Sequence, residues 1–384
     1  MKVNTKYKNI IIVMLLLIIL ISTFVVYNQE KQSFIKGQAN YQLTYNYLIE
    51  NKGPIPLNYL GIRLAILKSW DNLQQVNTIT SNIQPNRTVI DEYDNNFAWY
   101  EMDQFAIGGV LNISFDVDLS VNILDYTGLN IENPSYDKQN EQYSLYMAYD
   151  PLADPNDLRI KSTVISLPYE TESIVDKVFA SYNFTSTYLR YRLIADSKGA
   201  SFAITNGYGD CDEYMNLFIA LNRANGIPTI GHTAWFADFQ KGYSTTDQGS
   251  VAHAYPMFYV EGLGLIPADP TRGKDSLFDN WMKKDHQTIT MTRGPDHPYR
   301  LLRYRWQPIE GLPSPEVVNN YTVSIKDLEI EYFSNIRRSI ILINFAIPVL
   351  FIIYNVRKSK QDIAYQKQKL DKLLNPRLER DDFI

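Results

Sequence analysis

Two uncharged apolar segments of 18 residues, one near each end of the chain, constrain its fold more than any other feature. The first is 10–27, IIIVMLLLIILISTFVVY, and the second is 339–356, SIILINFAIPVLFIIYNV. A helix of this length can cross the hydrocarbon core of a bilayer. The second segment contains Asn344 and Pro348, so a buried core helix is the alternative there, although membrane helices tolerate an internal proline. We predict a transmembrane helix at both positions.

Charge predicts the orientation of these two helices. Three lysines precede the first one, and the tail 357–384 carries eight Lys or Arg and five Asp or Glu. Because basic flanks stay in the cytoplasm, we predict that residues 1–9 and the tail are both cytoplasmic. Two arginines on the opposite side of the second helix weakly oppose this orientation. A cleaved signal peptide is the alternative at the N-terminus, but its apolar region is usually about 7–15 residues long, and no Ala-x-Ala site follows.

The segment between the two helices is acidic and holds the only cysteine of the chain, Cys211. It contains 26 basic and 37 acidic residues. Such a surface disfavours binding to nucleic acid, whose phosphates need basic partners. A single cysteine also excludes a disulfide within the chain. We therefore predict a two-pass protein of the cell membrane, with the lipid bilayer as a partner and this segment outside the cytoplasm.

Residues 38–165 have the pattern of an antiparallel β-sandwich domain. The clearest strand is 111–123, where apolar residues alternate with Asn, Ser and Asp, as in a strand with one buried and one solvated face. Other strands are expected at 41–49, 61–67 and 97–102, and turn residues separate them. Several short strands without a helical period favour a sandwich.

The pattern changes near residue 166 and predicts an α+β domain over 166–310. Helices are expected at 170–180 and 186–194, and a third begins near Cys211. Strands resume after about residue 251. We interpret 311–338 as a stalk that leads to the second transmembrane helix.

An acidic cluster precedes this domain but does not predict a metal site. Asp150, Asp154 and Asp157 offer oxygen ligands that calcium accepts, yet the Pro and Asp residues around them favour turns. No Cys/His pattern typical of zinc occurs. We therefore predict no metal and no cofactor.

Cys211 lies at the start of a well-delimited helix. Asp210 is a suitable N-cap, Glu213 completes a capping box, and Gly226 ends the helix. The positive end of a helix lowers the pKa of a thiol, whereas Asp210 and Asp212 raise it, so a nearby imidazolium would have to complete the activation. The alternative is a small buried cysteine that only packs.

A hairpin after residue 251 places a histidine near an aspartate. The turn at 261–264 lies midway between His253 and Asp269, so the two residues should face each other across the hairpin. A carboxylate there can bind one imidazole nitrogen and leave the other for a thiol, as in a catalytic triad. The alternatives are a solvated strand histidine and an Asp-Pro turn.

At these motifs the sequence resembles the transglutaminase-like superfamily. The resemblance covers about residues 170–296. It rests on four segments in family order, which are Gly209-x-Cys211, Arg223-Ala224-Asn225-Gly226-Ile227-Pro228, His253-Ala254-Tyr255 and Asp269-Pro270-Thr271. Tyr255 replaces the usual tryptophan of the third segment, which affects the expected shape of the acyl pocket.

The resemblance implies a papain-like core with Cys211 as nucleophile, His253 as base and acid, and Asp269 as the residue that orients the histidine. Attack on an amide would give a thioester, which water or an amine then resolves, and the Cys211 backbone N–H would bind part of the oxyanion. The expected function is a membrane-anchored cysteine protease, peptidase or transglutaminase that acts on proteins or peptides outside the cytoplasm. The alternative is a catalytically silent envelope binding module.

Overall fold

The computed structural model describes residues 33–131, 133, 136–236, 252–271, 280–295, 302–307, 317–333, 353–354 and 356–371, together with residues 14, 19 and 21. Phe34–Glu331 form one compact unit. Met1–Ser33 and Tyr332–Ile384 form a second unit. The predicted transmembrane segments 10–27 and 339–356 lie almost wholly outside the described residues. Among the residues that are described, no helix is both long and apolar enough to cross a membrane.

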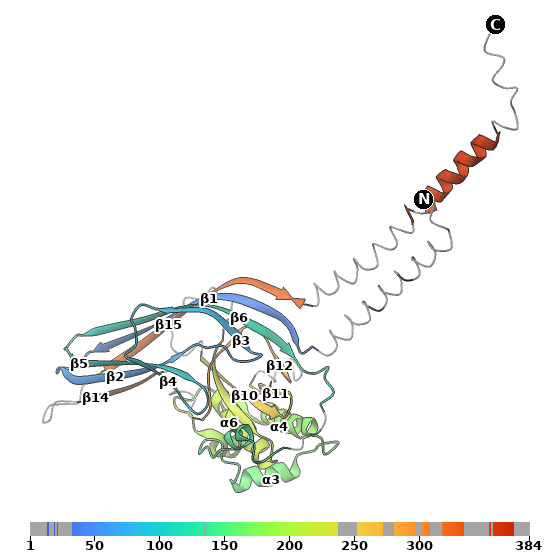
Figure 1. Cartoon of the computed structure of the whole chain (residues 1–384). Coiled ribbons are helices and arrows are strands. Elements are labelled where there is room, and N and C mark those ends of the chain that lie inside the picture. The colour runs from blue at the N-terminus through green and yellow to red at the C-terminus, as the bar shows by residue number, and fades with distance from the viewer. Residues whose placement is uncertain are drawn as a thin grey trace. The chain divides into compact units, whose positions relative to one another are not determined.

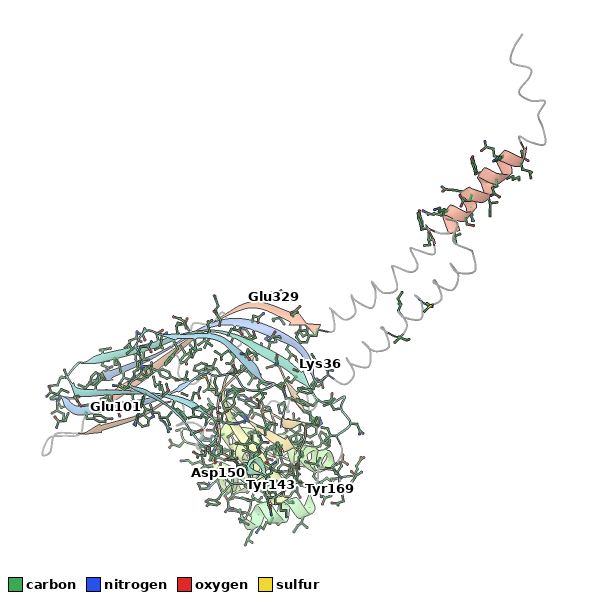
Figure 2. All side chains as sticks on the ribbon, in the orientation of Figure 1. Lys36, Glu101, Tyr143, Asp150, Tyr169 and Glu329 are labelled. Atoms are coloured by element: carbon green, nitrogen blue, oxygen red, sulfur yellow. The ribbon has the colours of Figure 1, made fainter. Side chains whose placement is uncertain are left out.

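The compact unit contains two sheets that pack face to face. The first sheet has the order β12-β6-β1-β15, with β3 also paired to β6. Its strands are β1 (Ile35–Asn51), β3 (Gln74–Ser81), β6 (Val110–Asp125), β12 (Lys283–Lys284) and β15 (Val317–Tyr332). The second sheet has the order β14-β2-β5-β4. Its strands are β2 (Leu57–Ile66), β4 (Arg87–Ile90), β5 (Asn96–Phe105) and β14 (Leu302–Gln307). In Figure 2, the label Glu101 marks strand β5 of the second sheet.

Alternation of side chains explains how these sheets pack. β1 pairs with β6 in antiparallel register, with Leu43 opposite Val117. The predicted strand 111–123 lies within β6, and its apolar side chains point inward. A single core contains side chains of both sheets, including Tyr45, Val117, Ile62 and Phe97. The antiparallel sheets expected from the sequence are therefore present.

The stalk predicted for 311–338 is wrong for residues 317–332, because these residues form β15 beside β1 (Figure 1). Val323 is 2% exposed and belongs to the core between the sheets. β14 likewise pairs with β2. A strand from within the predicted catalytic domain (β14) and one from the predicted stalk (β15) thus complete the sandwich, so the sandwich does not end at residue 165.

A third sheet and a group of helices form the rest of the unit (Figure 1). The sheet has the order β11-β10-β9-β13, built from β9 (Thr229–Phe236), β10 (Ala252–Val260), β11 (Gly264–Pro267) and β13 (Thr288–Arg293). The helices are α2 (Glu141–Tyr146), α3 (Leu158–Ser166), α4 (Ile174–Tyr188), α5 (Gly199–Asn206) and α6 (Cys211–Ala224).

Neighbouring residues of β9 show that the third sheet is covered on both faces. Trp235 belongs to the core of the sandwich, whereas Ala234 belongs to a second core with Phe218 of α6 and Tyr182 of α4. Consecutive strand residues point to opposite faces. The third sheet therefore lies between the sandwich and the two helices.

The structure corrects the helices expected at 170–180 and 186–194. A single helix, α4, spans Ile174–Tyr188, and Ser173 caps its N-terminus by accepting a hydrogen bond from Asp176 N. The chain then enters β7 (Arg190–Tyr191), which pairs in parallel with β8 (Tyr208–Gly209). This pairing brings residues 190–191 next to the segment that precedes Cys211.

Candidate active site

Hydrogen bonds at the start of α6 hold Cys211 in the first turn of the helix. The predicted capping box is present, since Asp210 Oδ1 accepts from Asp212 N at 3.1 Å and Glu213 Oε2 accepts from Asp210 N at 3.2 Å. The second oxygen of Glu213 accepts from Lys198 N at 2.7 Å, and this glutamate is fully buried. Both carboxylates thereby tie the residues around Cys211 to the preceding loops.

A steric constraint explains why the Gly-x-Cys motif has glycine at residue 209. A Cβ atom at Gly209 would lie 2.2 Å from Glu213 Cβ, which is closer than two carbon atoms can approach. Only glycine therefore allows the chain to pass over the buried glutamate. At the other end of the helix, Gly226 has a φ of +75°, and glycine adopts this left-handed conformation without strain.

The body of α6 is anchored in the core, and its N-terminus meets β10. Leu217, Phe218 and Leu221 are at most 1% exposed. Cys211 packs against a small cluster that includes Ala254 of β10, the residue after His253. The helix and the strand therefore bring Cys211 to the residue that follows the predicted base.

His253 and Asp269 are in contact, as the hairpin predicted. His253 Nε2 lies 2.7 Å from Asp269 Oδ2, and the two side chains are 11% and 10% exposed. Val260 pairs with Gly264, so the hairpin centre is residue 262 rather than 261. Thr271 N donates to Asp269 Oδ1 at 3.1 Å and fixes the carboxylate. With Nε2 bound to Asp269, Nδ1 is the nitrogen left for the thiol.

Contacts from neighbouring elements support this pair. Ser186 Oγ of α4 donates to Pro270 O at 2.9 Å. Tyr255 is 1% exposed, its Oη lies 2.8 Å from Thr290 Oγ1, and its ring is stacked with that of His253 at 6.3 Å between centroids. Tyr255, the departure from the family pattern, thus packs beside the catalytic candidate.

The surroundings of Cys211 do not by themselves favour the thiolate. Burial raises the pKa of the thiol well above its usual range, and the carboxylates of Asp212 and Asp210 raise it further. The Ala254 backbone N–H has the opposite effect but is weaker than these. Burial, together with Asp210 and Glu213, also raises the pKa of Asp212 to about 7, against an opposing effect of His253. Ionisation of the thiol therefore requires a positive charge from elsewhere.

Tyr191 is a functional candidate that the sequence analysis missed. Its side chain is 52% exposed, and burial followed by the charge of Cys211 raises the pKa of its phenol to about 12. The phenol is therefore neutral at physiological pH and lies within electrostatic range of the Cys211 thiol. The sequence contains a signal for this strand, because residues 189–193, LRYRL, alternate between apolar and basic, which is typical of a strand rather than a helix.

The acidic cluster near residue 150 forms turns and a helix cap, as the sequence analysis favoured. Asp150 Oδ1 accepts from Leu152 N at 3.0 Å. The carboxylates of Asp154 and Asp157 each accept from the backbone N–H two residues later, at 2.8 Å. In the described part of the chain, no group of three or more His, Cys, Asp or Glu side chains is arranged to hold a metal ion.

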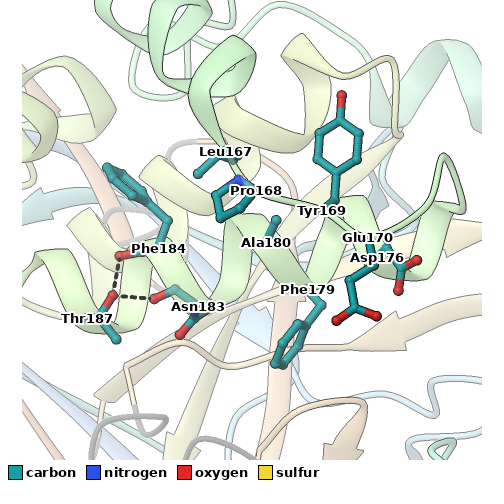
Figure 3. Close-up of a pocket in the computed structure, with 10 residues that line it drawn as sticks. All are labelled: Leu167, Pro168, Tyr169, Glu170, Asp176, Phe179, Ala180, Asn183, Phe184 and Thr187. Carbon is teal, nitrogen blue, oxygen red and sulfur yellow. Dashed lines mark hydrogen bonds between the residues drawn. The ribbon is translucent and has the colours of Figure 1, made fainter.

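An open groove of about 670 Å³ runs along the outer face of α4 (Figure 3). Asp176, Ala180, Asn183 and Thr187 line it at helical spacing, whereas Val178 lies on the opposite, buried face. Figure 3 shows that Leu167 and Pro168 border the groove from the preceding segment. Because the predicted triad does not line it, this groove is separate from the thiol.

Residues 164–270 match the model of the transglutaminase-like superfamily. The match includes the helix that begins with Cys211, the strand that contains His253, and also Asp269. No curated protein sequence matches the chain.

The solved structures similar to the chain include the following two. One is a candidate cysteine protease from Cytophaga hutchinsonii, with 12% identity, a TM-score of 0.55, and coverage of 76% of this chain and 91% of that protein. The other is the periplasmic domain of TgpA from Pseudomonas aeruginosa, with 11% identity, coverage of 63% and 91%, and a TM-score of 0.32, which is too low to support an argument. The first comparison establishes a common fold and nothing about activity. Residues 164–270 are thus a transglutaminase-like domain of the kind found in a superfamily of cysteine enzymes.

Proposed function

We propose that the chain is a cysteine enzyme that acts on amide bonds of proteins or peptides through a thioester. Cys211 is the nucleophile, His253 is the general base and acid, and Asp269 orients the histidine. One observation carries the proposal. The 2.7 Å contact between His253 Nε2 and Asp269 Oδ2 lies next to Ala254, against which Cys211 packs. This proximity supports a triad of Cys211, His253 and Asp269.

The first half of the reaction forms the acyl-enzyme. Cys211 transfers its thiol proton to His253 Nδ1, and the sulfur attacks the amide carbonyl carbon. The C–N bond then breaks as His253 returns the proton to the leaving amine. The products are a free amine and a thioester on Cys211. Asp269 stabilises the imidazolium that exists between the two proton transfers.

The second half releases the acyl group. Water attacks the thioester, gives a proton to His253 and yields a carboxylic acid with the regenerated thiol. If an amine attacks in place of water, the product is a new amide, which is a cross-link when the amine is a lysine. Both reactions use the same groups, so the geometry of the triad supports either one.

Two hydrogen-bond donors are proposed to bind the oxyanion. The backbone N–H of Cys211 is in the first turn of α6, and first-turn N–H groups have no partner within their own helix. The phenol of Tyr191 interacts electrostatically with the Cys211 thiol. A neutral hydroxyl and an N–H aimed at a developing negative charge stabilise the tetrahedral intermediate. We therefore propose Tyr191 as the side-chain donor.

The proposed location is the outer face of the cell membrane, with two membrane helices and cytoplasmic termini. The support is the length of the two apolar segments and the distribution of basic residues around them. Because Cys211 is the only thiol, a membrane-impermeant maleimide tests this directly. Intact cells should give a labelled protein, and labelling only after lysis would contradict the proposed orientation.

The activity is tested with the full-length chain purified in detergent, unfolded casein as substrate, and a fluorescent primary amine. New N-termini report hydrolysis, and incorporated fluorescence reports transfer. Wild type should give one or both signals, and Cys211→Ala should give neither. Equal signals from both proteins would contradict the proposal. No signal from wild type, together with an unreactive thiol, would favour the silent binding module.

A further inference from the structure

A second pocket, of about 100 Å³, lies where the sandwich meets the third sheet. Residues of the sandwich region on one wall include Trp70 and Asp71. The other walls include His232 of β9, Tyr259 of β10 and Arg293 of β13. A volume of this size holds several waters or one small organic molecule. The pocket contains none of the residues of the proposed triad.

One wall, formed by Trp70, carries a buried hydrogen-bond donor that no described residue satisfies. Trp70 is 4% exposed, and its Nε1–H has no acceptor among the residues that the structure describes. Leaving a buried donor without an acceptor costs about 1–3 kcal/mol. A ligand acceptor within hydrogen-bond distance of Nε1 would remove this cost.

Two positively charged side chains lie over the same indole ring. The Arg293 guanidinium lies 4.7 Å from the centroid of the Trp70 ring, and its Nε donates to Tyr93 O at 2.8 Å. Lys68 Nζ is also 4.7 Å from this ring, although it pairs with Asp94 at 2.7 Å. The carboxylate of Asp71 lies at the exposed rim and opposes these charges.

We propose that this pocket binds a small carboxylate, which accepts hydrogen bonds from Trp70 Nε1–H and the Arg293 guanidinium. A carboxylate offers the two acceptor oxygens that an N–H and a guanidinium need, and guanidinium–carboxylate contacts are among the stronger hydrogen bonds. The apolar remainder of the ligand would contact the rings of Tyr146 and Tyr259. The small volume restricts the ligand to a few non-hydrogen atoms.

A stack of three rings connects the pocket to the proposed triad. His232 lies opposite Tyr255 in the pairing of β9 and β10, with 5.2 Å between the ring centroids. Tyr255 is in turn stacked with His253 at 6.3 Å and an interplanar angle of 7°. A ligand that contacts His232 therefore alters the packing beside His253. This effect on catalysis rests on the proposed function, whereas the binding itself does not.

The test measures binding of sodium propionate to the full-length chain by ligand-observed NMR. Propionamide, which has the same shape without the charge, is the matched probe. Propionate should bind saturably, and propionamide should bind at least about tenfold more weakly. Trp70→Phe, which keeps a ring and removes the N–H, should weaken propionate binding several-fold. Arg293→Gln should weaken it by about tenfold or more.

A matched pair of controls uses the other arginine and tryptophan that contact each other in the sandwich. The Arg87 guanidinium lies 4.9 Å from the Trp99 ring. Arg87→Gln and Trp99→Phe should bind propionate like wild type. Thermal unfolding of every variant shows whether lost binding reflects lost folding, and Trp70→Phe remains decisive if Arg293→Gln is unstable.

Three results would overturn the proposal. The first is that wild type does not bind propionate saturably. The second is that propionamide binds as tightly as propionate. The third is that the control variants lose as much affinity as Trp70→Phe. The measurement is repeated in Cys211→Ala, which has no nucleophile. Unchanged binding there separates this site from the proposed catalytic function, so that either proposal can fail without the other.

Discussion

The two sides of the proposed active site differ in how they are built. On the β10–β11 side, the His253–Asp269 contact is held by a backbone donor from Thr271 and by the hydrogen bond from Ser186 to Pro270. On the α6 side, Cys211 is half-buried, and burial and two carboxylates raise the pKa of its thiol. The histidine side is organised for its role, whereas the cysteine side resists ionisation.

This difference indicates that the thiol depends on the histidine for its charge. A helix N-terminus normally favours a thiolate, but here Asp210 and Asp212 counteract it. In the proposed mechanism, the His253–Asp269 pair supplies the missing positive charge. The variants below test each side, from the largest expected effect to the smallest.

Replacement of the nucleophile should have the largest effect. Cys211→Ala removes the only thiol and should lower acyl transfer or hydrolysis by at least about 1,000-fold, to the background of the assay. The His253–Asp269 contact should survive, because it does not involve α6. Hydrolysis of casein measures the activity, and the imidazole NMR signals of His253 report its contact with Asp269. Residual activity above one-tenth of wild type would exclude Cys211 as the nucleophile.

Asp269→Asn should have the next largest effect. The amide can still hydrogen-bond His253 but cannot stabilise the imidazolium, so activity should fall by about 100- to 10,000-fold. The rate of Cys211 alkylation at pH 6 should fall as well. Asp154→Asn, which changes a surface turn carboxylate of the same type, is the control and should keep both properties. An unchanged alkylation rate in Asp269→Asn would contradict the role of the carboxylate.

Tyr191→Phe removes one proposed oxyanion donor and keeps the ring. Activity should fall by about 10- to 100-fold, less than for the triad variants, because the Cys211 N–H remains. The change should lie mainly in kcat, since the donor acts on the tetrahedral intermediate. Tyr188→Phe is the matched control, because its hydroxyl donates to Ile204 O at 2.7 Å, away from the sulfur. An effect confined to KM would argue against the donor role.

Asp212→Asn should have the smallest effect on activity. Unlike the other variants, it should increase the reactivity of the Cys211 thiol. Removing this carboxylate lowers the thiol pKa, so alkylation at pH 7 should become about two- to fivefold faster. Stability should change too. The folded-state pKa of Asp212 is raised to about 7, so its ionisation destabilises the fold above that pH and has no effect below its unfolded value.

Thermal unfolding tests this linkage across pH. Asp212→Asn should unfold at a higher temperature than wild type at pH 8, and the difference should shrink to nothing as the pH falls through 7 toward 4. A difference that is constant across this range would show that the charge of Asp212 is not its cause.

The sequence predicts the parts of the site that depend on local rules. The capping box of α6, the glycine at its end and the contact across the hairpin all follow from short-range geometry, and the structure contains each of them. The antiparallel sheets follow from alternation in β6. These features need no knowledge of distant contacts.

The missed features depend on pairing between segments far apart in the chain. β15 joins β1 across more than 250 residues, and no local signal says which strand a segment will join. The pairing of β7 with β8 puts Tyr191 opposite Gly209, two residues before Cys211, in a segment for which a helix was predicted. The resistance of the thiol to ionisation depends on burial, which a sequence pattern does not measure.

The most direct test of the central claim is the pH dependence of Cys211 alkylation by iodoacetamide, in wild type and His253→Ala. Because the chain has one thiol, every adduct reports on this residue. The account predicts that wild type reacts well below the usual thiol pKa of about 8.5. In His253→Ala the reaction should shift above that value, because burial and the carboxylates then act without an imidazolium. Identical profiles in the two proteins would contradict the ion pair and, with it, the proposed enzyme.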